Sequence, residues 1–248
     1  MVWAAALLAW TTLFAAEQWH DLIGGLGLRA WRAPAGAWVE ASEAFTNPED
    51  SKKLAWKAGQ GTLVNGPTGR TVNLLSTEEF GDIEARVEFM VAQGSNSGVY
   101  FMGRYEIQIF DSFGKEKVTA SDCGSIYQRW DPARGKGNEG FEGHAPRINA
   151  SKAPGTWQSF DVVFRAPRFD ASGKKTANAR FVKVAQNGQV IHENVEVTGP
   201  TRASTWQDEK AAGPIMLQGD HGPVAYRNIR IRPASPVRER SGSRVPPR

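Results

Sequence analysis

Three polar side chains with different chemistry alternate along one extended stretch of the sequence. Arg104, Glu106 and Gln108 are separated by single apolar residues, so they share one face of a β-strand with about 7 Å between neighbours. A carboxylate accepts hydrogen bonds, a guanidinium donates them and a carboxamide does both, so such a row could hold a polyhydroxylated ligand. The alternative is a solvated sheet face on which an Arg–Glu pair contributes little. The alternation alone does not decide between these two readings.

The elements that position this row are strands. Residues 83–91 and 157–165 alternate apolar and polar side chains, which is typical of half-buried strands. Residues 179–186 and 189–195 flank Asn187-Gly188, the strongest hairpin signal in the chain. We also expect residues 83–91 to form a hairpin with the polar stretch 95–111. Some ten to thirteen short strands and no convincing helical period predict an all-β sandwich or barrel, with one domain over residues 17–233.

Composition and charge exclude several classes of protein. The net charge of the 248 residues is only +4, and much of the positive charge lies near the C-terminus, so the body offers no basic face for nucleic acid. Residues 234–248 are rich in Arg, Ser and Pro, and we expect a disordered basic tail there. Cys123 is the single cysteine, which excludes an intrachain disulfide and a multi-cysteine metal site.

The first sixteen residues are apolar and end in small side chains, as a secretory signal does. They are too few to cross a bilayer as a helix, and no other apolar run is long enough for a membrane span. No Lys or Arg precedes the apolar run, which leaves a mis-chosen start codon or a buried N-terminal segment as alternatives. We expect export, to the periplasm or the medium.

Five motifs in linear order resemble one family. They are NSGVYFMGRYEIQIFDSFG, CGSIY, WQSFDVVFRAPRFD, NGQVIHENVEVTGPT and LQGDHGPVAYRNIRIRP, which span nearly all of residues 17–233. The sequence resembles the 3-keto-disaccharide hydrolase family, also called 3-keto-glucoside lyase/hydratase. The resemblance implies a concanavalin A-like jelly-roll sandwich of two curved antiparallel sheets in an exported protein. Residues 132–143 depart from the family as a long charged insertion, which could reshape the edge of a cleft.

The resemblance also implies a reaction. A glycoside oxidised at C3 has an acidic proton at C2, so a base can remove this proton and expel the glycosidic oxygen from C1; water then adds to the enone. Such a site needs a base, a group that stabilises the enolate oxygen, and an acid for the leaving oxygen.

Few residues suit these roles. His221 is the candidate base or metal ligand, Glu106 the alternative base or acid, and Arg104 the enolate-stabilising group. The candidates for binding the saccharide are Gln108, Asp111, Asn96, Tyr100 and Gln218, where Asp111 could instead cap its strand. His221 could equally cap its loop. A divalent cation held by Glu106 and His221 is conceivable, although no tight ligand motif occurs; no cofactor is certain.

Two other functions remain open at this stage. The same sandwich could be a non-catalytic carbohydrate-binding module, because a fold does not fix a function. It could also be a structural domain of the cell envelope held by its basic tail. An ionisable group placed to reach C2 would distinguish the enzyme from the binding module.

Overall fold

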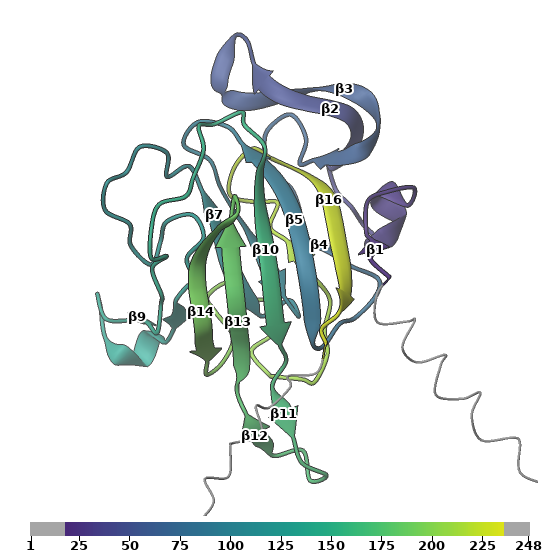
Figure 1. Cartoon of the computed structure of the whole chain (residues 1–248). Helices are drawn as coiled ribbons and strands as arrows, with labels where there is room; N and C mark the ends of the chain where they lie inside the picture. Colours follow the sequence, from purple (N-terminus) through teal and green to yellow (C-terminus); the bar gives the residue numbers. More distant parts are fainter. Residues whose placement is uncertain (1–17, 236–248) are drawn as a thin grey trace, which may run out of the picture.

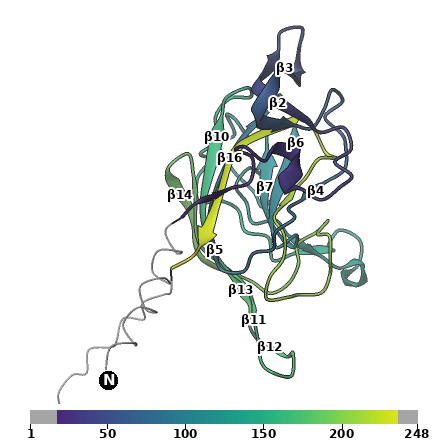
Figure 2. The same ribbon diagram turned by 90° about the vertical axis from the view of Figure 1, so that its right-hand side faces the viewer.

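Two antiparallel β-sheets pack face to face in the computed structural model, which describes residues 18–235 (Figures 1 and 2). The larger sheet has the order β14-β13-β10-β5-β16-β3-β2, with β1 paired to β16. Its strands are β1 (His20–Asp21), β2 (Val39–Asn47), β3 (Asp50–Val64), β5 (Ile83–Val91), β10 (Gln158–Arg165), β13 (Ala179–Gln186), β14 (Gln189–Val197) and β16 (Val224–Pro233).

The smaller sheet has the order β4-β15-β6-β7. It consists of β4 (Leu74–Leu75), β15 (Met216–Leu217), β6 (Asn96–Phe101) and β7 (Tyr105–Phe110). Single bridges from Ile107 to Ile126 and from Ile126 to His144 continue it beyond β7. The short pairs are β8 (Arg129–Trp130) with β9 (Gly140–Phe141) and β11 (Arg168–Phe169) with β12 (Lys175–Ala177); the 3-10 turns are η1 (Gly27–Ala30) and η2 (Pro132–Arg134). Residues 18–235 contain no α-helix, and the concanavalin A-like sandwich is confirmed.

The core lies between the two sheets, where the predicted alternation places its apolar faces. In β5 the odd-numbered residues are buried and Glu84, Arg86 and Glu88 point outward, as predicted. Phe101 of β6 lies 5.3 Å, centroid to centroid, from Phe164 of β10. These cross-sheet aromatic contacts fix the spacing of the sheets, because each large ring buries apolar area from both layers.

The polar stretch 95–111 is a hairpin of two strands rather than one strand. Met102 and Gly103 both have positive φ values, 58° and 63°, and the Arg104 amide closes the turn on the Phe101 carbonyl at 3.0 Å. The expected hairpin between residues 83–91 and this stretch is wrong. β5 pairs with β10 and β16 in the larger sheet, so the turn after β5 carries the chain across the sandwich to β6.

The Asn-Gly hairpin is confirmed, with Asn187 and Gly188 at φ values of 51° and 81° between β13 and β14. A histidine of this hairpin, His192 in β14, lies inside the protein although a hairpin position favours the surface. Its side chain is buried, and its Nε2 lies 2.8 Å from the Gly124 carbonyl.

The predicted export signal at residues 1–16 lies outside the described residues, and so does the predicted tail after Ser235. The division of residues 17–233 into one domain stays a prediction. No helix within residues 18–235 has the length and apolarity needed to cross a membrane.

Candidate active site

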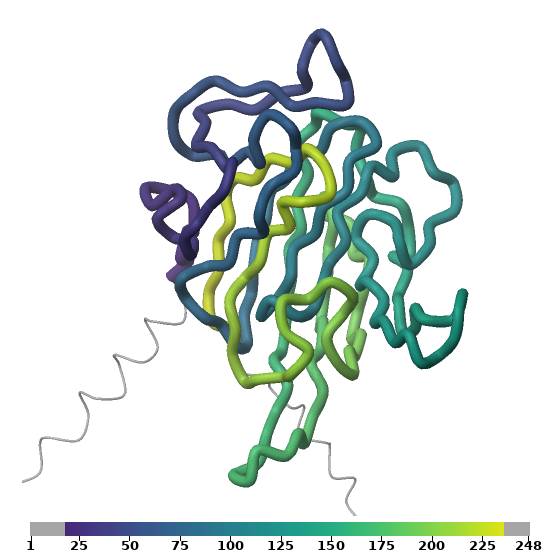
Figure 3. The backbone as a smooth tube through the Cα atoms, turned by 180° about the vertical axis from the view of Figure 1, so that it is seen from behind, coloured from purple at the N-terminus to yellow at the C-terminus, as the bar shows by residue number. Residues whose placement is uncertain are grey.

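The polar face of β7 is buried, not solvated. Glu106 is 2% exposed and Gln108 is 4% exposed, although both point away from the core that Tyr105 and Ile107 enter. Loops cover this face of the smaller sheet: Figure 3 views the molecule from this side, with the loops of residues 113–145 and 199–215 bordering the sheet. Burying a carboxyl group is unfavourable unless something compensates, so this face needs an explanation other than surface polarity.

A cavity of about 320 Å³ opens over this face. Its lining residues are Asn96, Tyr100, Glu106, Gln108, Tyr127, Arg202, Ala203, Gln218 and His221. Six of the eight residues predicted for the site therefore surround one cavity, including those from the β6–β7 hairpin and His221 from the turn before β16. The volume lies within the usual range of small-molecule sites.

Strand pairing places the polar groups side by side. Tyr100 of β6 is directly opposite Glu106 of β7, and Gly98 is opposite Gln108. A Cβ atom on Gly98 would lie 2.2 Å from the Glu106 Oε1 atom, so only glycine leaves room for this carboxyl group. The Glu106 amide also donates to the Thr201 hydroxyl, which anchors the 201–203 segment beside the carboxyl group.

Burial dominates the electrostatics of Glu106. It raises the pKa of the carboxyl group to about 8; the Tyr100 hydroxyl opposes this shift, and the negative charge of Asp220 adds to it. Burial and the neighbouring Glu106 in turn hold the pKa of Tyr100 well above its usual value. At neutral pH Glu106 is therefore mainly protonated, and it can donate a hydrogen bond into the cavity.

Three buried oxygen atoms on this face have no protein partner. They are Asn96 Oδ1, Glu106 Oε2 and Gln108 Oε1. Buried polar atoms are normally hydrogen-bonded, so these three oxygens around one cavity indicate a polar ligand, which supplies donors to the two amide oxygens and accepts from the protonated carboxyl group of Glu106. The hydroxyl groups of a saccharide are such donors.

His221 and Asp220 form a pair at the mouth of the cavity. The imidazole Nδ1 lies 2.5 Å from Asp220 Oδ1, and the His221 side chain is 45% exposed. When Nδ1–H donates to the carboxylate, Nε2 is left as an acceptor. This arrangement suits a general base, because the carboxylate fixes the orientation and the tautomer of the ring.

Sequence reasoning missed two residues of this site. Tyr127 follows the bridge at Ile126, and its amide donates to the Glu106 carbonyl at 3.1 Å. Arg202 is held by its backbone: its amide donates to the Gln128 carbonyl at 2.8 Å and its carbonyl accepts from the Tyr100 hydroxyl at 3.3 Å. The tyrosine of the CGSIY motif was the only local signal for either residue.

Arg104 does not join the cavity, so its predicted enolate-stabilising role requires correction. Its guanidinium donates to the Met102 carbonyl at 2.9 Å and to the Asp208 carboxylate at 2.8 Å, and it also contacts the Asp208 carbonyl. The group lies 5.0 Å from the centre of the Trp206 ring. Because Arg104 ends the hairpin turn, the alternation of β7 does not extend to it; the residue anchors the loop around Asp208 instead.

Asp111 is also outside the cavity. Its carboxylate accepts from the Gly94 amide at 2.8 Å and so stabilises the turn before β6, a role different from either of the two that its sequence suggested. Glu106 and His221, the two predicted cation ligands, do line the same cavity. Within residues 18–235, however, no group of three or more His, Cys, Asp or Glu side chains is arranged to hold a metal ion.

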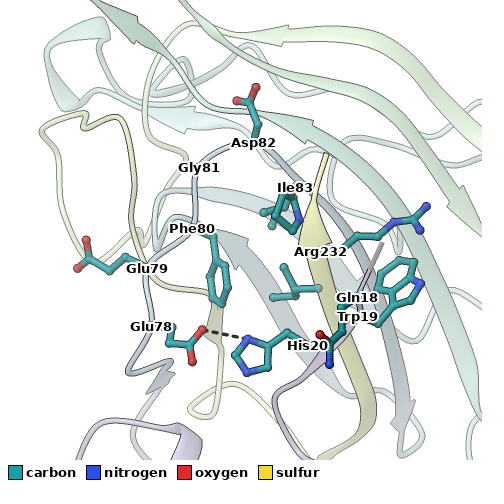
Figure 4. A pocket seen from close by; sticks show the side chains of 12 residues that line it. Gln18, Trp19, His20, Glu78, Glu79, Phe80, Gly81, Asp82, Ile83 and Arg232 are labelled. Atoms are coloured by element: carbon teal, nitrogen blue, oxygen red, sulfur yellow. Dashed lines mark ion pairs between the residues drawn. The ribbon is translucent and has the colours of Figure 1, made fainter. Parts of the chain in front are cut away.

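A larger cavity of about 620 Å³ lies elsewhere, between the first described residues and the end of β16 (Figure 4). There His20 Nδ1 lies 3.0 Å from Glu78 Oε2, and Arg232 lies over the Trp19 ring. Among the residues that the structure describes, none of the unpartnered buried oxygens belongs to this cavity. The unpartnered oxygens, which need a ligand, therefore make the smaller cavity the better candidate for the active site.

Comparisons with known proteins concern the family and the fold of the chain. A search of curated proteins gave no match. One solved structure, of a protein from Parabacteroides distasonis ATCC 8503 provisionally described as a glycosyl hydrolase, is 26% identical over 88% of this chain and 84% of its own, with a TM-score of 0.61. A second protein of that organism, with the same description, is 20% identical over 88% of this chain and all of its own, with a TM-score of 0.53.

The family comparison covers most of the chain. The model of the 3-keto-alpha-glucoside-1,2-lyase-like domain matches residues 18–232. With the first solved structure, it supports a carbohydrate-active function. The chain belongs to the 3-keto-alpha-glucoside-1,2-lyase-like domain family.

Proposed function

We propose that the protein is an exported enzyme, either secreted or periplasmic, that cleaves 3-keto-glycosides by elimination and hydration. The observation that carries this proposal is the buried carboxyl group of Glu106, which has a pKa of about 8 and lies in a cavity whose mouth holds the Asp220–His221 pair. A carboxyl group that stays protonated at neutral pH suits an enzyme that forms an enolate, because it can donate a hydrogen bond to the oxygen on which negative charge develops.

His221 is the base in this mechanism. Its free Nε2 takes the proton from C2, the electrons of the C–H bond form the enolate with the C3 ketone, and Asp220 fixes the orientation of the ring. The enolate then collapses to a C1–C2 double bond and expels the glycosidic oxygen, to which the imidazolium returns the proton. Water adds across the double bond, with its oxygen at C1 and a proton at C2.

Glu106 takes the role that Arg104 cannot fill. Its protonated carboxyl group donates a hydrogen bond to the oxygen at C3, where negative charge develops as the C2 proton leaves. Tyr100 helps to orient the carboxyl group, and Asn96 and Gln108 accept hydrogen bonds from the sugar hydroxyls. This mechanism does not need a pair of carboxylates at the separation found in ordinary glycosidases.

The test compares two histidines in the same kind of environment. His221→Ala should lower the turnover of a 3-keto-glucoside about a hundredfold or more and leave binding nearly intact. His20→Ala is the matched control, because His20 is also 45% exposed and also contacts a carboxylate, Glu78. It should change turnover less than twofold.

Glu106→Gln tests the proposed role of Glu106 as hydrogen-bond donor separately from the role of His221 as base. It keeps the shape but makes the donor weaker, and turnover should fall about a hundredfold. If wild-type protein binds saccharides and turns over no 3-keto-glycoside, the protein is a binding module. N-terminal sequencing of the protein from a periplasmic or culture fraction tests export; a mature chain that retains Met1 would contradict it.

A further inference from the structure

One residue of the cavity lining is an arginine that the proposed reaction does not use, and a tryptophan outside the lining stacks on it. Arg202 lines the cavity, and its guanidinium carbon lies 3.7 Å from the centre of the Trp130 ring. Trp130 is 38% exposed and belongs to β8, which precedes the charged insertion of residues 132–143. A stacked guanidinium keeps its in-plane N–H donors free, because the ring occupies only its face.

The backbone fixes this pair next to the reacting groups. Thr201 donates through its amide to the Arg104 carbonyl at 2.9 Å, and its hydroxyl accepts from the Glu106 amide at 3.1 Å. Arg202, the next residue, is bonded to Gln128 and Tyr100. Arg202 thus follows directly on Thr201, which is bonded to Glu106, and because Arg202 is itself exposed we place the stack at the rim of the cavity.

The charge of Arg202 is not neutralised within the described residues. Two arginines in or next to the insertion of residues 132–143 do have partners: Arg129 pairs with Glu142, and Arg134 donates to the Asn138 carbonyl. In residues 18–235, the ion pairs and side-chain hydrogen bonds do not include the guanidinium of Arg202. Across the β8–β9 pair, Trp130 is opposite Gly140, which adds no side chain to that position.

We propose that Arg202 and Trp130 form the subsite for the leaving portion of the substrate, and that this portion is a sugar with a carboxylate. The inference rests on the proposed function. The oxidised ring lies on Glu106 and Gln108, so the group attached at C1 extends to the rim; its ring packs on the exposed part of Trp130, and its carboxylate takes the free donors of Arg202. Glu106 does not repel this anion while it is protonated.

The experiment compares two 3-keto-disaccharides of the same anomeric configuration, whose leaving unit is either a hexuronate or the corresponding hexose. Arg202→Gln should lower the ratio of kcat/KM for the acidic over the neutral substrate about tenfold or more, through KM. Arg202→Lys should restore part of the ratio. Arg134→Gln is the matched control, because Arg134 also stacks on an aromatic ring, 4.4 Å from the centre of Phe141, and does not line the cavity.

Binding of the unoxidised disaccharides, measured by calorimetry, separates this inference from the proposed function. If the chain turns over no keto-substrate but Arg202→Gln selectively weakens binding of the uronate disaccharide, the subsite stands and the proposed reaction fails. If the chain turns over both keto-substrates and Arg202→Gln leaves their ratio unchanged, the subsite is refuted and the reaction stands. Equal effects of Arg202→Gln and Arg134→Gln would also refute it.

Discussion

Gly98 of β6 and Glu106 of β7 are in direct contact, because a Cβ on Gly98 would lie 2.2 Å from the Glu106 Oε1 atom. The φ angle of Gly98 is not in the left-handed region, so glycine is needed at this position only because a side chain would not fit. Gly98→Ala should displace the carboxyl group, destabilise the fold by about 1–3 kcal/mol and reduce turnover at least tenfold. Denaturant unfolding and steady-state kinetics measure the two effects.

The control for this prediction is a double-mutant cycle. In a Glu106→Ala background the added methyl group has room, so Gly98→Ala should cost much less stability there than in the wild type. If the two substitutions add without coupling, the contact is not what excludes a side chain at this position.

A second prediction concerns the dependence of stability on pH. The pKa of Glu106 is about 8 in the folded protein and near 4.5 in the unfolded chain, so the folded state binds more protons between these values. Stability should therefore fall as pH rises from about 4.5 to 8, by up to ~1.4 kcal/mol per pH unit from this group. Glu106→Gln should remove this part of the slope.

The measurement is the free energy of unfolding at several pH values for the wild type and Glu106→Gln. Their difference isolates Glu106, because the other titrating groups are common to both proteins. Parallel curves would show that the carboxyl group titrates near its ordinary value and would remove the basis for its role as an acid.

Local signals in the sequence predicted the strands well. The alternation of apolar and polar residues in β5 and the Asn187-Gly188 turn depend on residues that are neighbours in sequence, so both could be recognised without the structure. The Met102-Gly103 turn was missed because methionine is unusual at a positive φ. Burial of the Met102 side chain, which is 1% exposed, stabilises this turn, and burial of this kind depends on the whole fold.

The site was predicted where it depends on strand alternation and was not predicted where it depends on loops. Glu106 and Gln108 share a face because they alternate in β7. Tyr127 and Arg202 reach the same cavity through loops far apart in sequence, and their bonds to the backbone of Glu106 and Gln128 have no local pattern. Arg104 was wrongly predicted to face the same side as Glu106, because the alternation of side chains along a strand does not continue into a turn.

A third prediction concerns His192, which burial keeps neutral. Burial lowers its pKa to about 4, below the usual 6.5, and the nearby charges of His144 and Arg147 act in the same direction. The unfolded chain therefore binds more protons between pH 4 and 6.5, and stability should fall as pH drops through this window, by about 3 kcal/mol in total. His192→Gln should flatten this part of the acid unfolding curve.

The matched control is His20→Gln, because His20 is exposed. It should leave the acid unfolding curve close to that of the wild type. NMR titration of the His192 ring gives the value directly; a ring that titrates near 6.5 would contradict the prediction.

A fourth prediction separates an anchoring role of Arg104 from a catalytic one. Its guanidinium is 4% exposed and joins the hairpin turn to the loop at Asp208, so Arg104→Ala should cost about 2–3 kcal/mol of stability. Amide exchange in residues 201–214 should become faster, as measured by mass spectrometry. Lys210→Ala is the control: Lys210 contacts the same Asp208 carboxylate at 3.3 Å but is 65% exposed, so its loss should change little. If Arg104→Ala kept wild-type stability and exchange while turnover fell a hundredfold, Arg104 would act on the substrate, and the loop around Asp208 would have to move to admit it.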